Sequence, residues 1–502
     1  MKSKFALASV VFIGLTLLLK ISGLLRDMVI AYFFGDSYEA GAYLAAFVIP
    51  NMFILFLVTG MKNALVPSYI QAFHKGQGRS HLGQVFKGTF LISLVIGVLG
   101  AALAPLYIPL LYSGFGPDAT QIAIGVAAIY FISILFVGMN AVLEGYFDAE
   151  NRYSLSTVSQ IIVVLSLIAG AFLFAGQMGP YSLAFGYLAG TILSLLFKAV
   201  LVIPRKALNI RERLDLPEIK DFYGVLIPVG LTVAVGQINL MIDNIFASYF
   251  SSGAVTYVNY AKNLVHFPQA IFGVTIGTII FPLISKAEVS RDRAMFKRGL
   301  ENGLTTMFFI LLPSVIGMML LMPNLIQLLY ERGAFDHAAT MATSQVAYFY
   351  IGSVLFFSIQ VVIDKGYYSL KKGHLILTVS GLAILLKLVL NYLFTMWIGY
   401  RGIPLSSSVM AVFYVGACFL ILLRLIGGLN LKRIGLEYGK VILSVLIMAV
   451  IVLWFKSLLS SLGNFLFIIV IAVIGAIVYG LCALIFRIEA FAVVTAKFIQ
   501  KE

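Results

Sequence analysis

Residues 464–486 read NFLFIIVIAVIGAIVYGLCALIF, a strongly apolar stretch with no charged side chain. A helix needs about 20 predominantly apolar residues to cross the hydrocarbon core of a bilayer. A helix on the surface of a soluble protein would instead keep a polar face for water. The stretch therefore predicts a membrane-spanning helix, and the rest of the chain repeats this pattern.

The composition of the whole chain agrees with this prediction. Of its 502 residues, 61% are hydrophobic and only 11% are charged, whereas soluble domains carry about 25% charged residues. Too few polar residues remain to cover the surfaces of several soluble domains. This excludes a soluble enzyme, a disordered scaffold and a protein that binds nucleic acid through a basic surface. The sequence predicts an all-α polytopic membrane protein.

Apolar stretches bounded by glycine, proline or charge predict about 14 transmembrane helices. The run that follows Lys2 and Lys4 is interpreted as a retained first helix, because small-residue cleavage sites occur only at its start. The predicted spans are 6–25, 40–66, 85–113, 119–143, 154–176, 181–203, 222–250, 255–282, 301–330, 338–363, 374–398, 402–424, 440–461 and 464–487.

The net charge of +14 is explained mainly by topology. Lysine and arginine collect in alternate loops, as expected if those loops are cytoplasmic. The largest group lies in the connector 204–221, and Lys497 and Lys501 are in the C-terminal tail. Both termini are therefore predicted to be cytoplasmic. No nucleic-acid partner is expected.

The chain also contains an internal repeat. A shift of 216 residues places Gly14-Leu15-Thr16 on Gly230-Leu231-Thr232, and Asp27 on Asp243. A shift of 218 places Leu110-Leu111-Tyr112 on Leu328-Leu329-Tyr330. Six spans separate the copies, so the repeat is predicted to be parallel. The expected domains are an N-lobe (1–203), a basic linker (204–221), a C-lobe (222–424) and two further helices with a tail (425–502).

Nothing in the sequence resembles an enzyme's catalytic set. There is no glycine-rich nucleotide loop of the Walker type, and no Ser/His/Asp or Cys/His set can be assembled on one side of the membrane. Cys418 and Cys482 lie in apolar runs, and the histidines lack metal-ligand spacing. No enzymatic activity, cofactor or metal is predicted. A membrane potential or an Na⁺ or H⁺ gradient remains as a source of drive for transport.

Several segments resemble the MurJ/MviN family, lipid II flippases of the multidrug/oligosaccharidyl-lipid/polysaccharide exporter superfamily. The segments are Ile21-Ser22-Gly23-Leu24-Leu25-Arg26-Asp27, Phe34-Gly35, Ile49-Pro50-Asn51, Val66-Pro67, Phe267-Pro268, Gly277-Thr278, Phe281-Pro282 and Glu331-Arg332-Gly333-Ala334-Phe335. The resemblance implies alternating access between two lobes, with a polar headgroup in a cavity and a prenyl tail along a groove formed by the last two helices. It also implies a role in peptidoglycan synthesis, and thus in cell-wall biogenesis and cell shape.

Charged groups within spans are costly and mark candidate sites. The resemblance carries a basic residue onto Lys20, an arginine onto Arg26 and an aspartate onto Asp27. These could form a cationic patch that holds a diphosphate, with Asp27 orienting Arg26. The alternative is that Arg26 and Asp27 only mark the outer interface.

Other positions depart from the family pattern. The arginine implied after Pro50-Asn51 is Ile54, and the implied Asp-Arg pair before Phe267-Pro268 reads Lys262-Asn263. The predicted substrate-binding set is completed by Lys62, Lys262 and Asn263. Lys62 and Lys262 could equally reach toward an interface with their charged ends. His266 is expected to be a hydrogen-bonded packing residue. Glu144, Asp148, Glu150 and Arg152 are expected at solvated helix ends and lobe contacts.

The second half contains a candidate ion-coupling site. The resemblance implies a sodium site at Asp243, Lys387, Asn391 and Ser407, with the carbonyl of Ile403. Asn239 lies one turn before Asp243 and shares its face. Because Lys387 is a cation where a neutral ligand is implied, we expect an Asp243–Lys387 pair to replace the metal. Protonation of Asp243 could then couple transport to a proton gradient.

The predicted function is that of a flippase. It would move an undecaprenyl-diphosphate-linked cell-wall precursor, lipid II or a related lipid-linked glycan, from the inner to the outer leaflet of a bacterial plasma membrane. A monomer is expected. The alternatives are a cation-coupled exporter of small cationic drugs, which the basic cavity would repel, a membrane-embedded glycosyltransferase or ligase, and a scaffold that transports nothing.

Overall fold

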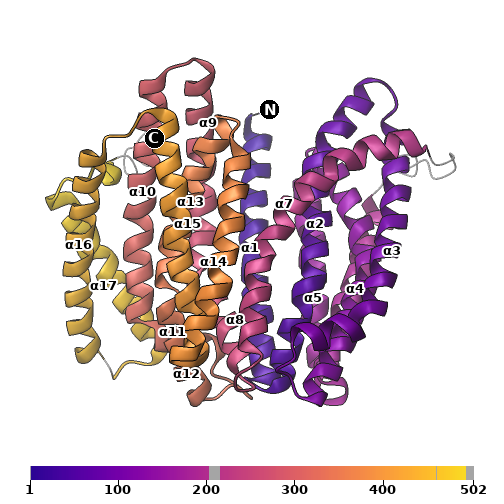
Figure 1. Cartoon of the computed structure of the whole chain (residues 1–502), viewed down its shortest axis with the longest axis horizontal. Coiled ribbons are helices and arrows are strands. Elements are labelled where there is room, and N and C mark those ends of the chain that lie inside the picture. The colour runs from indigo at the N-terminus through magenta and orange to yellow at the C-terminus, as the bar shows by residue number, and fades with distance from the viewer. Residues whose placement is uncertain (1, 203–214, 460, 493–502) are drawn as a thin grey trace. The chain divides into compact units, whose positions relative to one another are not determined.

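The computed structural model describes residues 2–202, 215–459 and 461–492, and in this part of the chain every regular element is helical (Figure 1). Most of the predicted basic linker, including Arg205, Lys206, Arg211 and Arg213, lies outside the described residues, as do Lys497 and Lys501 of the tail. The all-helical prediction is confirmed.

The helices of the first half follow the predicted order. They are α1 (Lys2–Phe34), α2 (Tyr38–His74), α3 (Gly78–Leu111), α4 (Pro117–Ala149), α5 (Tyr153–Met178), α6 (Tyr181–Leu196), the π-helical turn η1 (Phe197–Val202) and α7 (Leu216–Ala247). α1 continues through Gly23, so Lys20 and Asp27 lie on one helix, two turns apart.

The second half is more interrupted. Its elements are α8 (Ala254–Val265), η2 (Gln269–Gly273), α9 (Val274–Val289), α10 (Arg293–Leu320), α11 (Met322–Tyr330), α12 (His337–Phe349), α13 (Ile351–Ser369), α14 (Gly373–Ile398), η3 (Gly399–Arg401), α15 (Gly402–Ile426), α16 (Leu431–Leu458) and α17 (Asn464–Ile485). The predicted span 301–330 is broken at Leu321, where Pro323 stands near the start of α11. Proline is favoured in the first helical turn because it has no backbone N–H to leave unbonded there.

Nine helices in the described residues are long and apolar enough to cross a membrane, and one of these stretches, 373–426, contains both α14 and α15. The count becomes ten if α12 and α13, which are bent by 47° at their junction, form one span. The chain is therefore a multi-pass membrane protein, and the figure of 14 spans stays a prediction.

Contacts between helices divide the chain into two compact units. The first contains Met1–Thr256 together with Arg332–Asp336, and the second contains Tyr257–Glu331 and His337–Glu502. In the first unit α2 packs against α4 and α7, and α3 packs against α4. Their shared core includes Met61, Leu65, Leu143, Phe147 and Leu226.

The Arg-Gly-Ala-Phe motif packs against the end of α1 within the first unit. The backbone N–H of Ala334 donates to the carbonyl of Tyr32 over 2.9 Å. Gly35 and Gly333 have φ of 56° and 59°, a conformation that costs glycine little. A Cβ on Gly35 would lie 2.3 Å from the Ala334 oxygen, so the close approach itself requires glycine.

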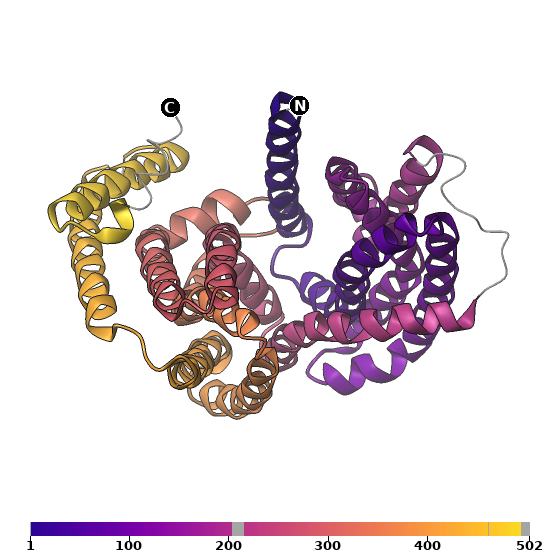
Figure 2. The same cartoon turned by 90° about the horizontal axis from the view of Figure 1, so that it is seen from above.

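In the second unit, α16 and α17 pack together as a hairpin at the end of the chain (Figures 1 and 2). Tyr479 on α17 donates to the carbonyl of Phe309 on α10 over 2.7 Å. Arg433 on α16 donates to Glu301 on α10 over 3.1 Å, and also to Glu489 beyond α17. The Arg433 guanidinium holds the pKa of the Glu489 carboxyl below its ordinary value. These contacts attach the hairpin to α10.

Similar turns in the two halves of the chain agree with the predicted internal repeat. After α4, Arg152 N–H donates to the Phe147 carbonyl and Asn151 has φ of 58°. After α13, Lys372 N–H donates to the Tyr367 carbonyl and Lys371 has φ of 56°. These positions differ by 220 residues, as do Gly179 and Gly399, which follow α5 and α14 with positive φ.

The turn after α2 matches the turn after α9 at a different spacing. Gln77 N–H donates to the Ala72 carbonyl, and Asp292 N–H donates to the Ala287 carbonyl. This is a spacing of 215. The offset therefore changes along the chain, around the values of 216 and 218 seen in the sequence, because the copies differ by a few residues between their helices.

Helices α5 and α6 touch through glycine. A Cβ on Gly186 would lie 2.8 Å from the Ser166 oxygen and 2.9 Å from the Leu167 Cα. Small residues allow helix backbones to approach closely in membranes. We expect Gly186→Ala to lower the free energy of unfolding by about 1–3 kcal/mol, the usual cost of overpacking, and to lower the melting temperature in detergent. Gly176→Ala on α5 is the control, because a Cβ there meets nothing within 4 Å. An equal effect of the two variants would contradict this packing argument.

Candidate functional site

Arg26 and Asp27 on α1 form an ion pair. Arg26 Nη2 and Nε donate to Asp27 Oδ1 over 2.7 and 3.0 Å. The Arg26 side chain is 32% exposed and that of Asp27 is 6% exposed. The buried carboxylate therefore fixes a guanidinium that keeps part of its surface accessible. Lys20 lies on the same helix, but its side chain is outside the described residues.

Lys62 on α2 faces two carboxylates of α4. Its ammonium nitrogen lies 3.8 Å from Glu144 Oε2 and 3.7 Å from Asp148 Oδ2. The Lys62 side chain is 34% exposed. The expectation that Glu144 and Asp148 are solvated is wrong, because both lie largely inside the first unit. Carboxylates near a helix end can turn inward when lysines are available to pair with them.

Lys198 lies on the inner side of this group and is not among the site residues predicted from the sequence. Lys198 lies in the π-helical turn η1 and is fully buried. Its ammonium donates to Glu144 Oε1 over 2.9 Å and to Asn140 Oδ1 over 2.7 Å. The sequence contains a signal for Lys198, because it is a lysine inside the otherwise apolar span 181–203. Charged residues inside membrane spans are rare and usually functional.

Neutral groups complete the hydrogen bonding. Gln160 on α5 donates to Glu144 Oε2 over 2.7 Å, and Ser156 donates to Asp148 Oδ1 over 2.9 Å. Asn140 in turn donates to the Thr191 carbonyl over 2.8 Å. The charges are thus paired and hydrogen-bonded across α2, α4, α5 and η1, as a buried ionic group must be to persist. We call Lys62, Glu144, Asp148 and Lys198 the charge cluster.

The remaining predicted binding residues lie on α8 and just after it. Lys262 is half-buried and Asn263 is exposed. His266 Nδ1 lies 2.7 Å from Gln269 Oε1, and its Nε2 lies 3.2 Å from Ser353 Oγ. These two hydrogen bonds agree with the expectation that His266 is hydrogen-bonded.

The predicted ion-coupling residues are all buried. Asp243 lies inside the first unit, on α7. In the second unit, Lys387 and Asn391 are one turn apart on α14, and α15 contributes Ser407 and Ile403. The Asn391 Oδ1 accepts a hydrogen bond from Ser406 rather than from Ser407.

A sodium site does not fit this donor set. The Lys387 ammonium has three donors and no acceptor, so it cannot ligate a cation. Lys387 and Asn391 are both buried, one turn apart on α14. No group of three or more His, Cys, Asp or Glu side chains arranged for a metal occurs in the described residues.

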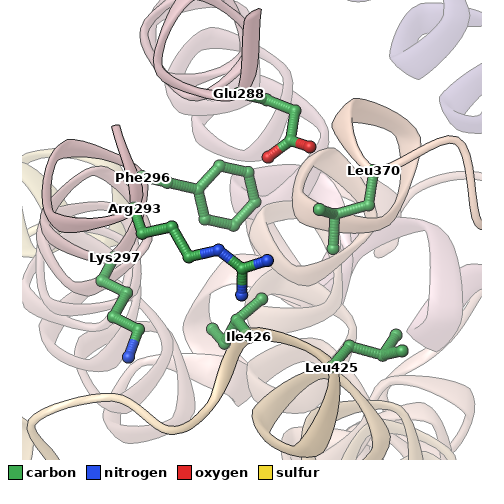
Figure 3. A pocket seen from close by; sticks show the side chains of 7 residues that line it. All are labelled: Glu288, Arg293, Phe296, Lys297, Leu370, Leu425 and Ile426. Atoms are coloured by element: carbon green, nitrogen blue, oxygen red, sulfur yellow. The ribbon is translucent and has the colours of Figure 1, made fainter. Parts of the chain in front are cut away.

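Two pockets lie near helix ends and contain none of the predicted site residues. In the first unit, a cavity of about 490 Å³ lies beside the turn between α2 and α3, with Ser68, Lys75, His81 and Asp221 on its wall. In the second unit, a hollow of about 40 Å³ is lined by Glu288, Arg293, Phe296, Lys297, Leu370, Leu425 and Ile426 (Figure 3). There Lys297 donates to the Gly427 carbonyl over 2.9 Å, so part of this basic lining caps a helix end.

Charged side chains buried among apolar spanning helices are typical of membrane transporters. Residues 30–473 match the model of the family described as "Lipid II flippase MurJ". The lipid II flippase MurJ of Burkholderia cenocepacia is 29% identical over 432 residues, 82% of either chain. A probable lipid II flippase MurJ of Thermotoga maritima is 26% identical over 477 residues, 94% of either chain.

Solved structures agree with these matches. A lipid II flippase MurJ in an inward closed conformation superposes with a TM-score of 0.80 and 26% identity, covering 95% of this chain and 99% of that one. An inward-facing multidrug MATE transporter has a TM-score of 0.69 and 14% identity, over 83% of this chain and 98% of that one, and shares the fold alone. The chain belongs to the lipid II flippase MurJ family. The resemblance seen in the sequence is confirmed.

The charge cluster generates a stability prediction. We expect Lys198→Met to lower the melting temperature in detergent strongly, because Glu144 is left as a buried charge, a change that typically costs about 3–5 kcal/mol. Lys198→Met combined with Glu144→Gln should recover most of that loss, because the pair is then neutral. Thermal unfolding of the purified full chain measures both. A double variant as unstable as the single one would show that Lys198 stabilises the unit by something other than this pair.

Proposed function

We propose that this protein is an alternating-access flippase for an undecaprenyl-diphosphate-linked cell-wall precursor, lipid II or a related lipid-linked glycan. It moves this cargo from the inner to the outer leaflet of a bacterial plasma membrane. The observation that carries the proposal is the match to lipid II flippases over nearly the whole length of both chains. The protein moves its cargo without changing a covalent bond, so it is a transporter rather than an enzyme.

The basic residues supply the chemistry that such a cargo needs. A diphosphate is bound by guanidinium and ammonium groups through charge-assisted hydrogen bonds. Arg26 suits this role because Asp27 fixes its guanidinium while leaving part of it exposed. We assign Lys20, Lys62, Lys262 and Asn263 to the same headgroup-binding set. The hairpin of α16 and α17, whose outer surface is apolar, is assigned to the prenyl tail.

We further propose a monomer with both termini in the cytoplasm, in agreement with the distribution of lysine and arginine between the loops. In this orientation the inside-negative membrane potential favours outward movement of an anionic headgroup.

We expect Arg26→Ala to abolish flipping, because a diphosphate loses its planar bidentate donor, and Arg26→Lys to restore it only partly. The measurement is growth of the native host after depletion of the wild-type protein, with the variant supplied in trans. Accumulation of a lipid-linked precursor on the cytoplasmic side identifies the cargo. Lys432→Met, at an exposed position outside the predicted set, is the control and should sustain growth. Growth supported by Arg26→Ala would remove Arg26 from the site, and drug sensitivity without an accumulated precursor would contradict the flippase itself.

The proposed ion coupling depends on the charge of Lys387. We propose that its ammonium supplies the positive charge that the family resemblance assigns to sodium, with Asp243 as the expected counter-charge. Coupling, if an ion is used, then runs through protonation of Asp243.

Sodium should therefore have no specific effect on the wild-type protein. We expect the same melting temperature in NaCl and in choline chloride, and the same flipping rate in proteoliposomes. Lys387→Asn, which replaces the ammonium with a neutral ligand, should gain stabilisation by Na⁺. Sodium-dependent flipping that survives Lys387→Ala but is lost in Asp243→Asn would show that a metal site remains.

A further inference from the structure

The charge cluster of the first unit is costly and yet is not required by the repeated fold. Four charged side chains lie together in an apolar bundle, and two of them, Glu144 and Lys198, are buried. Buried ion pairs often contribute less to stability than apolar side chains of similar volume. If the repeated fold itself required such a cluster, the second copy of the repeat would contain one too.

The second copy has no such cluster at the equivalent positions. At the 220-residue spacing fixed by the turns, Asn140 and Glu144 correspond to Gln360 and Asp364, and Lys198 corresponds to Cys418. Gln360 donates to Asp364 over 2.7 Å, and an uncharged thiol stands at the position of the Lys198 ammonium. The second copy also continues as α-helix through Cys418, whereas the first forms the π-helical turn η1 around Lys198.

The second copy also lacks a lysine at the position that corresponds to Lys62 of α2. At the 215-residue spacing of the α2 and α9 turns, Lys62 corresponds to Gly277. A Cβ on Gly277 would lie 3.2 Å from Cε of Lys365, so a lysine of α13 occupies this space instead. Lys365 lies over the rings of Phe281 and Tyr368, at 5.3 and 5.9 Å. The repeat thus folds with two different charge arrangements, and that of the first unit needs another explanation.

The geometry of Lys62 suggests that explanation. Its nitrogen is 3.7–3.8 Å from both carboxylates, beyond the roughly 3.2 Å of a direct hydrogen bond, and its side chain is 34% exposed. Its N–H groups can therefore bond a further anion. Two carboxylates around one lysine would repel that anion. Lys198 removes this obstacle, because it pairs with Glu144 from the buried side.

We propose that Lys198 and Glu144 are positioning residues for phosphate recognition by Lys62. Lys198 neutralises Glu144, Asp148 alone balances Lys62, and the cluster as a whole is neutral before a lipid phosphate arrives. The inference rests on the proposed function, since it takes the cargo to be a lipid diphosphate. It adds Lys198 and Glu144 as the residues that set how tightly Lys62 binds a phosphate.

The proposal predicts that affinity follows the net charge of the cluster rather than the stability of the protein. Asp148→Asn leaves a charge of +1, wild type and the Lys198→Met/Glu144→Gln double variant are neutral, and Lys198→Met leaves −1. Each unit of charge should change the affinity for a diphosphate by about three- to ten-fold, as expected for unit charges about 6 Å apart in a partly hydrated site with an effective dielectric constant of about 40–80.

The test is binding of geranylgeranyl diphosphate to the purified full chain in detergent, by native mass spectrometry or calorimetry. We expect Asp148→Asn to bind about three- to ten-fold more tightly than wild type and Lys198→Met to bind about three- to ten-fold more weakly. The double variant, in which Glu144 is also neutral, should bind about three- to ten-fold more tightly than Lys198→Met. Geranylgeraniol, which lacks the phosphates, should bind all four equally. When Lys62→Gln is added to Asp148→Asn, the tighter binding should be lost. The control Lys432→Met should bind like wild type.

Three results would overturn the proposal: no binding of the diphosphate to wild type, affinities that follow melting temperature, or equal charge dependence for the alcohol. Should Lys198→Met fail to fold, Asp148→Asn, the double variant and Lys62→Gln still decide the question. The host depletion assay tests the proposed function separately. Growth supported by wild type without the expected order of affinities would reject this inference and leave the flippase in place.

Discussion

The free-energy cost of placing charge inside an apolar bundle constrains the rest of this structure. Only 11% of the residues are charged, and helices of the membrane interior offer few partners for them. Each buried charge must therefore find an opposite charge or several hydrogen bonds. Lys198 shows the requirement most clearly, since it is fully buried and bonds both Glu144 and Asn140. Helices α2, α4, α5 and η1 are joined by polar contacts at this one place.

The two copies of the repeat meet this constraint in different ways. Equivalent turns after α4 and α13 show that the two copies share a backbone design. Their buried charges nevertheless occupy different positions. Leu167 of the first unit corresponds to Lys387 of the second at the 220-residue spacing, while Lys198 corresponds to Cys418. Each copy contains a fully buried lysine, in a place where the other has an uncharged side chain. The two units thus place their buried lysines at different positions.

The features that were predicted correctly from the sequence are those whose signal is summed over many residues. The helical, membrane-spanning character of the chain and the family resemblance both rest on long stretches and are both confirmed, whereas the count of 14 spans and the internal repeat stay predictions. Reasoning about single charged residues was weaker. Glu144 and Asp148 stand near the end of α4, where solvation is the ordinary outcome, yet both turn inward toward Lys62. Continuous spans were predicted at 301–330 and 338–363, whereas the chain is broken or bent within both.

The amino-acid sequence by itself determined that this is a multi-pass helical membrane protein with a duplicated scaffold, because hydropathy and self-similarity are properties of the chain alone. It also pointed to the Arg26–Asp27 pair, whose members are adjacent. Only the tertiary structure decided that Lys198 meets Glu144 across 54 residues, and that Ser406 rather than Ser407 bonds Asn391. The physical reason is that partners on different helices depend on how each helix is rotated and how deeply it packs, which the spacing within one helix does not specify.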